Sequence, residues 1–187
     1  MSRDGSLWGS IQRYFGGFRK SQRRTIHDLC WGLLGRGRVG LAEMARGMCD
    51  RTTVRHRIKR IERFVTNPRI EMRAACMALV RWMVSGEHEA VVALDWTDLG
   101  DYRLLAAKVA IARRGVPVAW RVLRQGEFSR RTKSRNDAEE ELILLLREAL
   151  KNRRWVLVAD RGFARADLFR KLDRWGIQYV IRSSGNP

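Results

Sequence analysis

Two aspartates, Asp95 and Asp160, each come directly after a short apolar run of the kind that forms a buried strand. Residues 91–94 read Val-Val-Ala-Leu before the first, and residues 156–159 read Val-Leu-Val-Ala before the second. An unpaired charge is costly at the end of a buried strand, so both acids are candidate site residues. Carboxylate oxygens suit Mg²⁺ or Mn²⁺, and a pair of such ions can cleave a phosphodiester. We therefore predict that Asp95 and Asp160 are catalytic metal ligands.

The elements expected around these acids follow a definite order. Strands are predicted at residues 90–96, 103–112, 116–123, 155–160 and 178–181, and helices at 136–150 and 164–175. The first three strands would form an antiparallel meander, which gives the order βββαβαβ. This order resembles the ribonuclease H-like arrangement, in which the first and fourth strands are neighbours. Neighbouring strands lie about 4.8 Å apart, so Asp95 and Asp160 would come together.

A structural role is the alternative for the two acids. Each carboxylate could cap the end of its strand, or it could pair with a nearby arginine such as Arg161. Two further acids of this region, Asp98 and Asp101, are expected in a loop or turn.

Upstream of about residue 86 the apolar residues recur at helical spacing. Ser21 is expected to cap a helix, and the inner face of that helix would be Ile26, Leu29, Cys30, Leu33 and Leu34. A later helix at 71–84 would bury Met72, Ala75, Cys76, Leu79, Val80 and Met83. We predict an all-helical region at residues 1–88, followed at residues 89–187 by part of a ribonuclease H-like mixed sheet with flanking helices, an α+β or α/β fold.

Between those helices, residues 41–48 and 52–65 predict two helices separated by a short turn, as in a helix-turn-helix. The second helix has an apolar stripe, and its members are Val54, Ile58, Ile61 and Val65. Its opposite face carries basic side chains at helical spacing, namely His56, Lys59, Arg60 and Arg63. We predict that this face binds DNA; a solvated charged surface is the alternative.

The overall charge points to the same partner. The formal net charge of +18 favours a polyanion, because Lys and Arg displace the counterions condensed on phosphate. A high arginine content that merely reflects genomic base composition is the alternative. A basic loop and the residue after the second acid add further expected DNA contacts, namely Arg130, Arg131, Lys133 and Arg161.

The spacing of the cysteines and the lengths of the apolar runs argue against disulfide-rich, zinc-binding and membrane-spanning proteins. Cys30, Cys49 and Cys76 are widely spaced and odd in number, which argues against a disulfide framework and a zinc site. The longest apolar run, residues 142–146, is too short to span a bilayer. We therefore expect a cytoplasmic protein with no membrane partner.

Two segments resemble the IS-four family of bacterial DDE transposases: residues 93–97, Ala-Leu-Asp-Trp-Thr, and residues 159–163, Ala-Asp-Arg-Gly-Phe. The resemblance continues through residues 115–120 and 168–172 to residues 176–182, and more loosely it includes residues 60–67. It implies Mg²⁺-dependent (or Mn²⁺-dependent) hydrolysis at transposon ends and strand transfer, with Asp95 and Asp160 as the first two metal-binding acids. The implied partner is double-stranded DNA at terminal inverted repeats in the nucleoid, and a homodimer would hold the paired ends.

The family's third acid lies in a later helix with the pattern Tyr-x-x-Arg-x-x-x-Glu-x-x-x-x-x-x-Lys, and residues 1–187 contain no such helix. Glu139, Glu140, Glu141 and Glu148 precede the fourth strand, which is the wrong place. The resemblance therefore implies a truncated form with little activity of its own. The alternative is a DNA-binding remnant that inhibits full-length transposase. A stand-alone nuclease or resolvase would need a complete acidic cluster.

Overall fold

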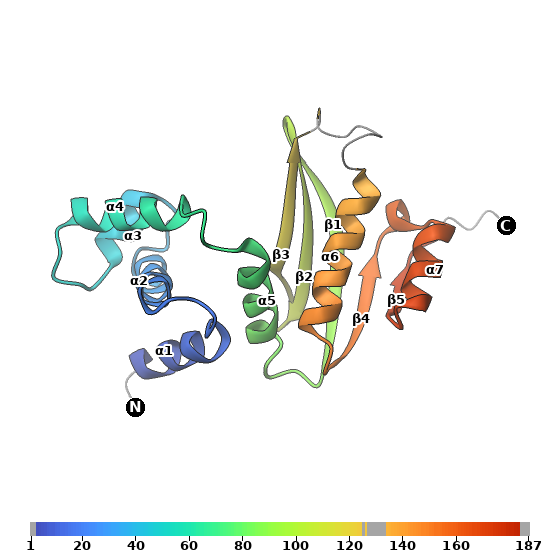
Figure 1. Cartoon of the computed structure of the whole chain (residues 1–187), viewed down its shortest axis with the longest axis horizontal. Helices are drawn as coiled ribbons and strands as arrows, with labels where there is room; N and C mark the ends of the chain where they lie inside the picture. Colours follow the sequence, from blue (N-terminus) through green and yellow to red (C-terminus); the bar gives the residue numbers. More distant parts are fainter. Residues whose placement is uncertain (1–2, 125, 127–133, 184–187) are drawn as a thin grey trace. The chain divides into compact units, whose positions relative to one another are not determined.

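A computed structural model describes residues 3–124, 126 and 134–183 of the chain (Figure 1). The chain divides into two compact units, Met1–Ala75 and Cys76–Pro187. The division falls inside helix α5 (Met72–Met83), upstream of the boundary expected after residue 88. The reason is that Cys76, Val80 and Val84 belong to the hydrophobic core of the second unit. Within the described residues, no helix combines the length and apolar character needed to cross a membrane.

Helices form the described part of the first unit. They are α1 (Arg3–Tyr14), α2 (Lys20–Arg36), α3 (Leu41–Gly47) and α4 (Val54–Val65). The expected helix-turn-helix pair corresponds to α3 and α4, which pack around the buried residues Ala45, Met48 and Ile61. Thr53 caps α4, because its hydroxyl accepts a hydrogen bond from the backbone N–H of His56.

Helix α2 differs from its prediction in both its start and its buried face. It begins at Lys20, with Arg19 rather than Ser21 as the N-cap residue. Its buried positions are the small residues Thr25 and Gly32, whereas Leu34 of the expected inner face is 72% exposed. Leu29 of the expected face packs against the buried cluster of α3 and α4, so the prediction holds in part and fails at Leu34.

Two glycines explain how α2 packs against α3. A Cβ atom on Gly32 would lie 2.4 Å from the backbone oxygen of Met44, and one on Gly47 would lie 2.5 Å from the backbone oxygen of Gly32. Real Cβ atoms do not approach other atoms this closely, so the two backbones can meet only where side chains are absent. Apolar periodicity cannot report such a contact, because glycine contributes nothing to an apolar stripe.

The second unit contains one mixed sheet of five strands. In chain order these are β1 (Glu89–Leu99), β2 (Tyr102–Ile111), β3 (Arg114–Arg124), β4 (Arg154–Ala159) and β5 (Gln178–Ile181). The sheet order is β3-β2-β1-β4-β5. The β1–β2 and β2–β3 pairs are antiparallel, whereas β4 runs parallel to β1 and to β5. The predicted element order and the pairing of the first and fourth strands are confirmed.

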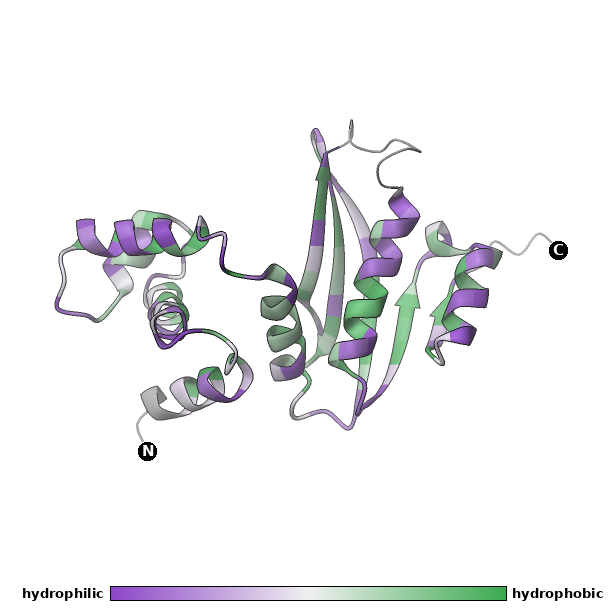
Figure 2. Ribbon diagram, in the orientation of Figure 1, coloured by the Kyte–Doolittle hydropathy of each residue, from purple (hydrophilic) through white to green (hydrophobic). Residues whose placement is uncertain are grey.

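Helices α5, α6 (Arg135–Ala149) and α7 (Ala166–Arg174) line up along one face of this sheet. The Arg81 side chain of α5 donates to the Ala149 carbonyl of α6 at 3.5 Å, and Lys171 of α7 pairs with Glu140 of α6 at 2.7 Å. Figure 2 shows hydrophobic residues concentrated along β4 and on α6. These residues form the core between the sheet and its helices.

The other face of the sheet is largely open. Strand alternation and register place Val91, Val122 and Val180 on it, and these side chains are 42%, 52% and 62% exposed. Asp95 has the same orientation as Val91, so the first predicted catalytic acid belongs to the open face.

Replacing Gly32 with Ala tests the close approach of α2 and α3. Alanine in a helix interior ordinarily stabilises a protein by up to about 1 kcal/mol relative to glycine. In Gly32→Ala we expect a loss of about 1–3 kcal/mol instead, because the added methyl group must push the two helices apart. Gly9→Ala in α1 is the control, since nothing lies within 4 Å of that Cβ position. Equal unfolding free energies for both variants, measured by denaturation and circular dichroism, would exclude the contact.

Candidate functional site

The parallel pairing of β1 with β4 brings the two predicted catalytic acids side by side. The last pair in register is Leu94 with Ala159. The residue after Leu94 is Asp95, and the residue after Ala159 is Asp160. Asp160 directly follows β4, as expected. Asp95 is not at the end of its strand, because β1 continues to Leu99 while pairing with β2 alone. Asp95 thus stands where β1 loses its β4 neighbour.

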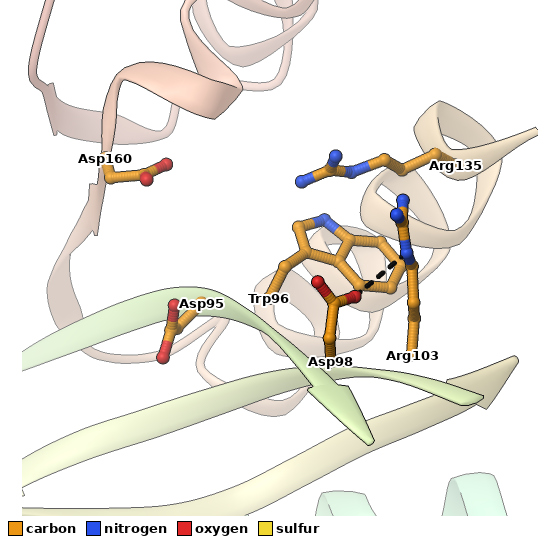
Figure 3. Close-up of a pocket in the computed structure, with 6 residues that line it drawn as sticks. All are labelled: Asp95, Trp96, Asp98, Arg103, Arg135 and Asp160. Carbon is orange, nitrogen blue, oxygen red and sulfur yellow. Dashed lines mark ion pairs between the residues drawn. The ribbon is translucent and has the colours of Figure 1, made fainter. Parts of the chain in front are cut away.

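The two carboxylates have different surroundings. Asp160 Oδ1 accepts a hydrogen bond of 2.9 Å from the backbone N–H of Gly162, within the short 3₁₀ turn η2 (Arg161–Phe163). Asp95 Oδ2 pairs with Nζ of Lys108 on β2 at 2.9 Å. In Figure 3 the Asp160 carboxylate extends over the cavity, whereas that of Asp95 points away from Trp96. The alternative structural roles, capping and ion pairing, are therefore both seen in part.

Both acids line a cavity of about 190 Å³, together with Trp96, Asp98, Arg103 and Arg135. Asp98 lies in β1 rather than in the expected loop, and it pairs with Arg103 of β2 at 3.0 Å. Asp101 lies in the turn between these strands, as expected. Arg135 and Arg103 stand on the far side of the cavity from Asp160 (Figure 3). The cavity thus has Asp95 and Asp160 on one side, and Arg103, Arg135 and Asp98 on the other.

The oxygen donors at this cavity suit a hard divalent cation such as Mg²⁺ or Mn²⁺, although they are few. Asp95 and Asp160 each offer a carboxylate, but Asp95 would have to exchange its Lys108 partner for the ion. Across the part of the chain that the structure describes, no group of three His, Cys, Asp or Glu residues could hold a metal ion. The site therefore fits a metal with two protein ligands and leaves most coordination positions open.

The residues that follow Asp160 differ in role. Arg161 is exposed and forms no ion pair with the described residues, so its guanidinium is accessible to an anion. Phe163 is 1% exposed and belongs to the core. A Cβ atom on Gly162 would lie 3.1 Å from Asp160 Oδ1, so a larger residue would crowd the carboxylate. The predicted contacts Arg130, Arg131 and Lys133 lie outside the described residues.

The basic side chains of α4 divide into two groups. His56, Lys59 and Arg63 are exposed, and of these Lys59 forms only a surface pair with Glu62 at 3.0 Å. Arg60 is half-buried and pairs with Asp28 of α2 at 2.9 Å and with Asp50 at 2.6 Å. Three of the four predicted basic side chains are therefore exposed on α4, whereas Arg60 contributes mainly to the packing of the first unit.

Arg57 and Asp50 hold the turn between α3 and α4. Arg57 donates to the carbonyls of Ala45, Met48 and Asp50, which satisfies the carbonyl groups left free at the end of α3. It also pairs with the Asp50 carboxylate at 2.7 Å. Burial raises the pKa of the Asp50 carboxyl, but hydrogen bonds from Thr52, Arg60 and Arg57 outweigh it, so the pKa lies well below its usual value.

Sequence reasoning missed four residues around the cavity: Trp96, Asp98, Arg103 and Arg135. Trp96 and Asp98 lie on the face of β1 opposite to Asp95, so strand alternation separates them from this acid rather than joining them to it. Arg103 and Arg135 come from separate elements, and only the tertiary structure brings them to the cavity.

Neither models of known protein families nor curated proteins match the chain.

Neutralising Asp50 tests the ion-pair network of the first unit. Asp50→Asn removes a charge that serves two arginines, so we expect a loss of about 2 kcal/mol in unfolding free energy at pH 7. The folded pKa is the lower one, so the stabilisation is complete above the unfolded pKa of about 3.9 and is lost as pH falls toward the folded value. In denaturation curves between pH 7 and pH 2, the variant should lose less stability than wild type.

Glu62→Gln on α4 is the matched control, because Glu62 pairs only with the exposed Lys59. Surface pairs contribute little, so its stability at pH 7 should stay close to that of wild type. A similar loss in both variants would show that the network does not hold the unit together.

Proposed function

We propose that the protein acts on double-stranded DNA through the strand cleavage and transfer chemistry of the IS-four family of DDE transposases. The observation that carries the proposal is the β1–β4 register, which sets Asp95 and Asp160 side by side on a cavity with an arginine-bearing opposite side. The strand order β3-β2-β1-β4-β5 supports a ribonuclease H-like catalytic unit. Sequence resemblance at residues 93–97 and 159–163 supports the same family.

The roles of the residues follow from their positions. Asp95 and Asp160 would hold one or two Mg²⁺ or Mn²⁺ ions, and bound ions would supply Lewis-acid activation of the attacking oxygen and stabilisation of the leaving one. Asp160 is oriented by the Gly162 N–H, so its second oxygen stays available to the cavity. His56, Lys59 and Arg63 contact DNA phosphates from α4, and Arg161 contacts phosphate near the acids. In transposition, two copies of the chain would hold the paired terminal repeats in the nucleoid.

Metal binding tests the acid pair without requiring turnover. Binding of Mn²⁺, followed by electron paramagnetic resonance, should be weakened about tenfold or more in Asp160→Asn and in Asp95→Asn, because each removes one of two charged ligands. Asp101→Asn is the control, since Asp101 lies in the β1–β2 turn and does not line the cavity. Equal Mn²⁺ affinity in wild type and both site variants would refute the assignment.

A second candidate function is DNA binding without cleavage, as in an inhibitor of a full-length transposase. The observation that favours it is the shortage of acidic ligands among the described residues, together with the Lys108 partner of Asp95. The two candidates differ in a nicking assay with Mg²⁺ and terminal-repeat DNA. Nicking that Asp160→Asn abolishes supports the transposase, whereas a gel shift without nicking supports the inhibitor.

The basic face of α4 predicts a specific salt dependence of DNA binding. Each phosphate contact contributes about 0.9 to the slope of log affinity against log salt concentration. Replacing Lys59 and Arg63 together with Gln should reduce that slope by about 1.8, because both side chains are exposed on α4. Fluorescence anisotropy of a labelled duplex at several salt concentrations measures this quantity.

The matched control for this double variant is Arg24→Gln combined with Lys20→Gln, two exposed basic residues of α2. The control makes the same change in net charge but leaves α4 intact. A slope that falls equally in both double variants would assign DNA attraction to the overall charge rather than to α4.

A further inference from the structure

The arginine-bearing side of the cavity is organised around one buried carboxylate, Glu139 of α6. Its side chain is 1% exposed. Its Oε1 accepts a hydrogen bond of 2.7 Å from the indole Nε1 of Trp96, and its Oε2 accepts one from Arg165. Oε1 also lies 3.4 Å from Nε of Arg135, one helical turn earlier. A buried carboxylate needs such partners, so the cluster is a stable feature of the fold.

Arg135 is fixed from two sides by this cluster. Its guanidinium carbon lies 4.9 Å from the centre of the Trp96 ring, which is the geometry of a cation–π contact. Its Nε lies 3.4 Å from Glu139 Oε1 as an ion pair and is buried without a hydrogen-bond partner, so the guanidinium keeps unused hydrogen-bond donors among the residues that the structure describes. Figure 3 shows this guanidinium extending over Trp96 on the side that faces Asp160. The side chain is 41% exposed.

We propose that Arg135 binds a backbone phosphate of the DNA strand in this cavity and that Glu139, through the Trp96 stack, is the positioning residue that orients it. The proposal rests on the proposed function, because it requires DNA in the cavity.

The chemistry of the two sides makes phosphate the fitting ligand. A guanidinium offers two parallel N–H donors to the non-bridging oxygens of a phosphodiester. Asp160 on the other side repels the same anion unless a cation lies between them, so a phosphate settles nearer to Arg135 in the absence of metal. Arg103 adds positive charge at this side, although its Nε already pairs with Asp98 at 3.0 Å. Arg135 therefore makes the principal contact.

Binding of a labelled 20-base-pair duplex to the full chain in EDTA tests the phosphate contact. Without metal, cleavage cannot contribute, so the assay is independent of activity. Arg135→Gln should weaken binding about tenfold at moderate salt and reduce the slope of log affinity against log salt by about 0.9. Arg154→Gln is the matched control, because Arg154 is exposed at the start of β4, the end remote from Asp160. It removes the same charge and should leave the slope unchanged.

The role of Glu139 is tested by combining variants. Glu139→Gln raises the net charge by one, so simple electrostatics predicts tighter DNA binding. If Glu139 positions Arg135, the loss of DNA affinity caused by Arg135→Gln should be smaller when Glu139 is already replaced by Gln. In that background the loss should be no larger than the loss caused by Arg154→Gln. Arg135→Lys is a second variant that does not depend on the stability of Glu139→Gln. It keeps the charge and the slope, but it should bind more weakly because it lacks the planar fork.

The outcomes separate the two proposals. A wild-type chain that does not bind the duplex overturns the proposed function together with this inference. A wild-type chain that binds, with identical behaviour of Arg135→Gln and Arg154→Gln, overturns the phosphate contact alone and leaves the proposed function standing. An undiminished Arg135→Gln effect in the Glu139→Gln background overturns the positioning role. Wild-type affinity in Arg135→Lys contradicts the requirement for a planar guanidinium.

Discussion

The parallel pairing of β1 with β4 is the constraint on which the second unit depends. It joins two strands that are separated in the chain by β2, β3 and α6, and its register ends at Leu94 and Ala159. Backbone hydrogen bonds fix this register, and a slip of one residue would move every side chain to the other face. The same register brings Asp95 and Asp160 to neighbouring positions.

Buried or half-buried carboxylates pair with arginines in both units and determine which basic residues remain available. Glu139 accepts a hydrogen bond from Trp96 and pairs with Arg135 and Arg165. Asp50 pairs with Arg57 and Arg60. Removing one member leaves an uncompensated buried charge, which is why these clusters resist change. In a chain of net charge +18, such acids divide the arginines into those that hold the fold and those that face solvent. We infer that DNA is bound by the second group.

The open face of the sheet carries Asp95 and its partner Lys108 among exposed valines, while α5, α6 and α7 cover the other face. Asp160 follows the end of β4, and its carboxylate extends over the cavity. The two acids are thus neighbours in register but differ in environment. In the proposed transposase, this difference makes Asp160 the better-prepared ligand and Asp95 the one that must leave an ion pair.

The sequence by itself determined the order of strands and helices, the α3–α4 pair and the neighbouring positions of Asp95 and Asp160, because apolar periodicity and strand order are local signals. It missed the close backbone approach of α2 and α3 at Gly32 and Gly47, and it placed the exposed Leu34 on the inner face of α2. It also missed Asp98 and Arg135 as cavity residues and treated Arg60 as a surface cation. Only the tertiary structure decided these points, because each depends on a contact with a residue far away in the sequence. A local sequence pattern does not show which such residues come close in space or how deeply they are buried.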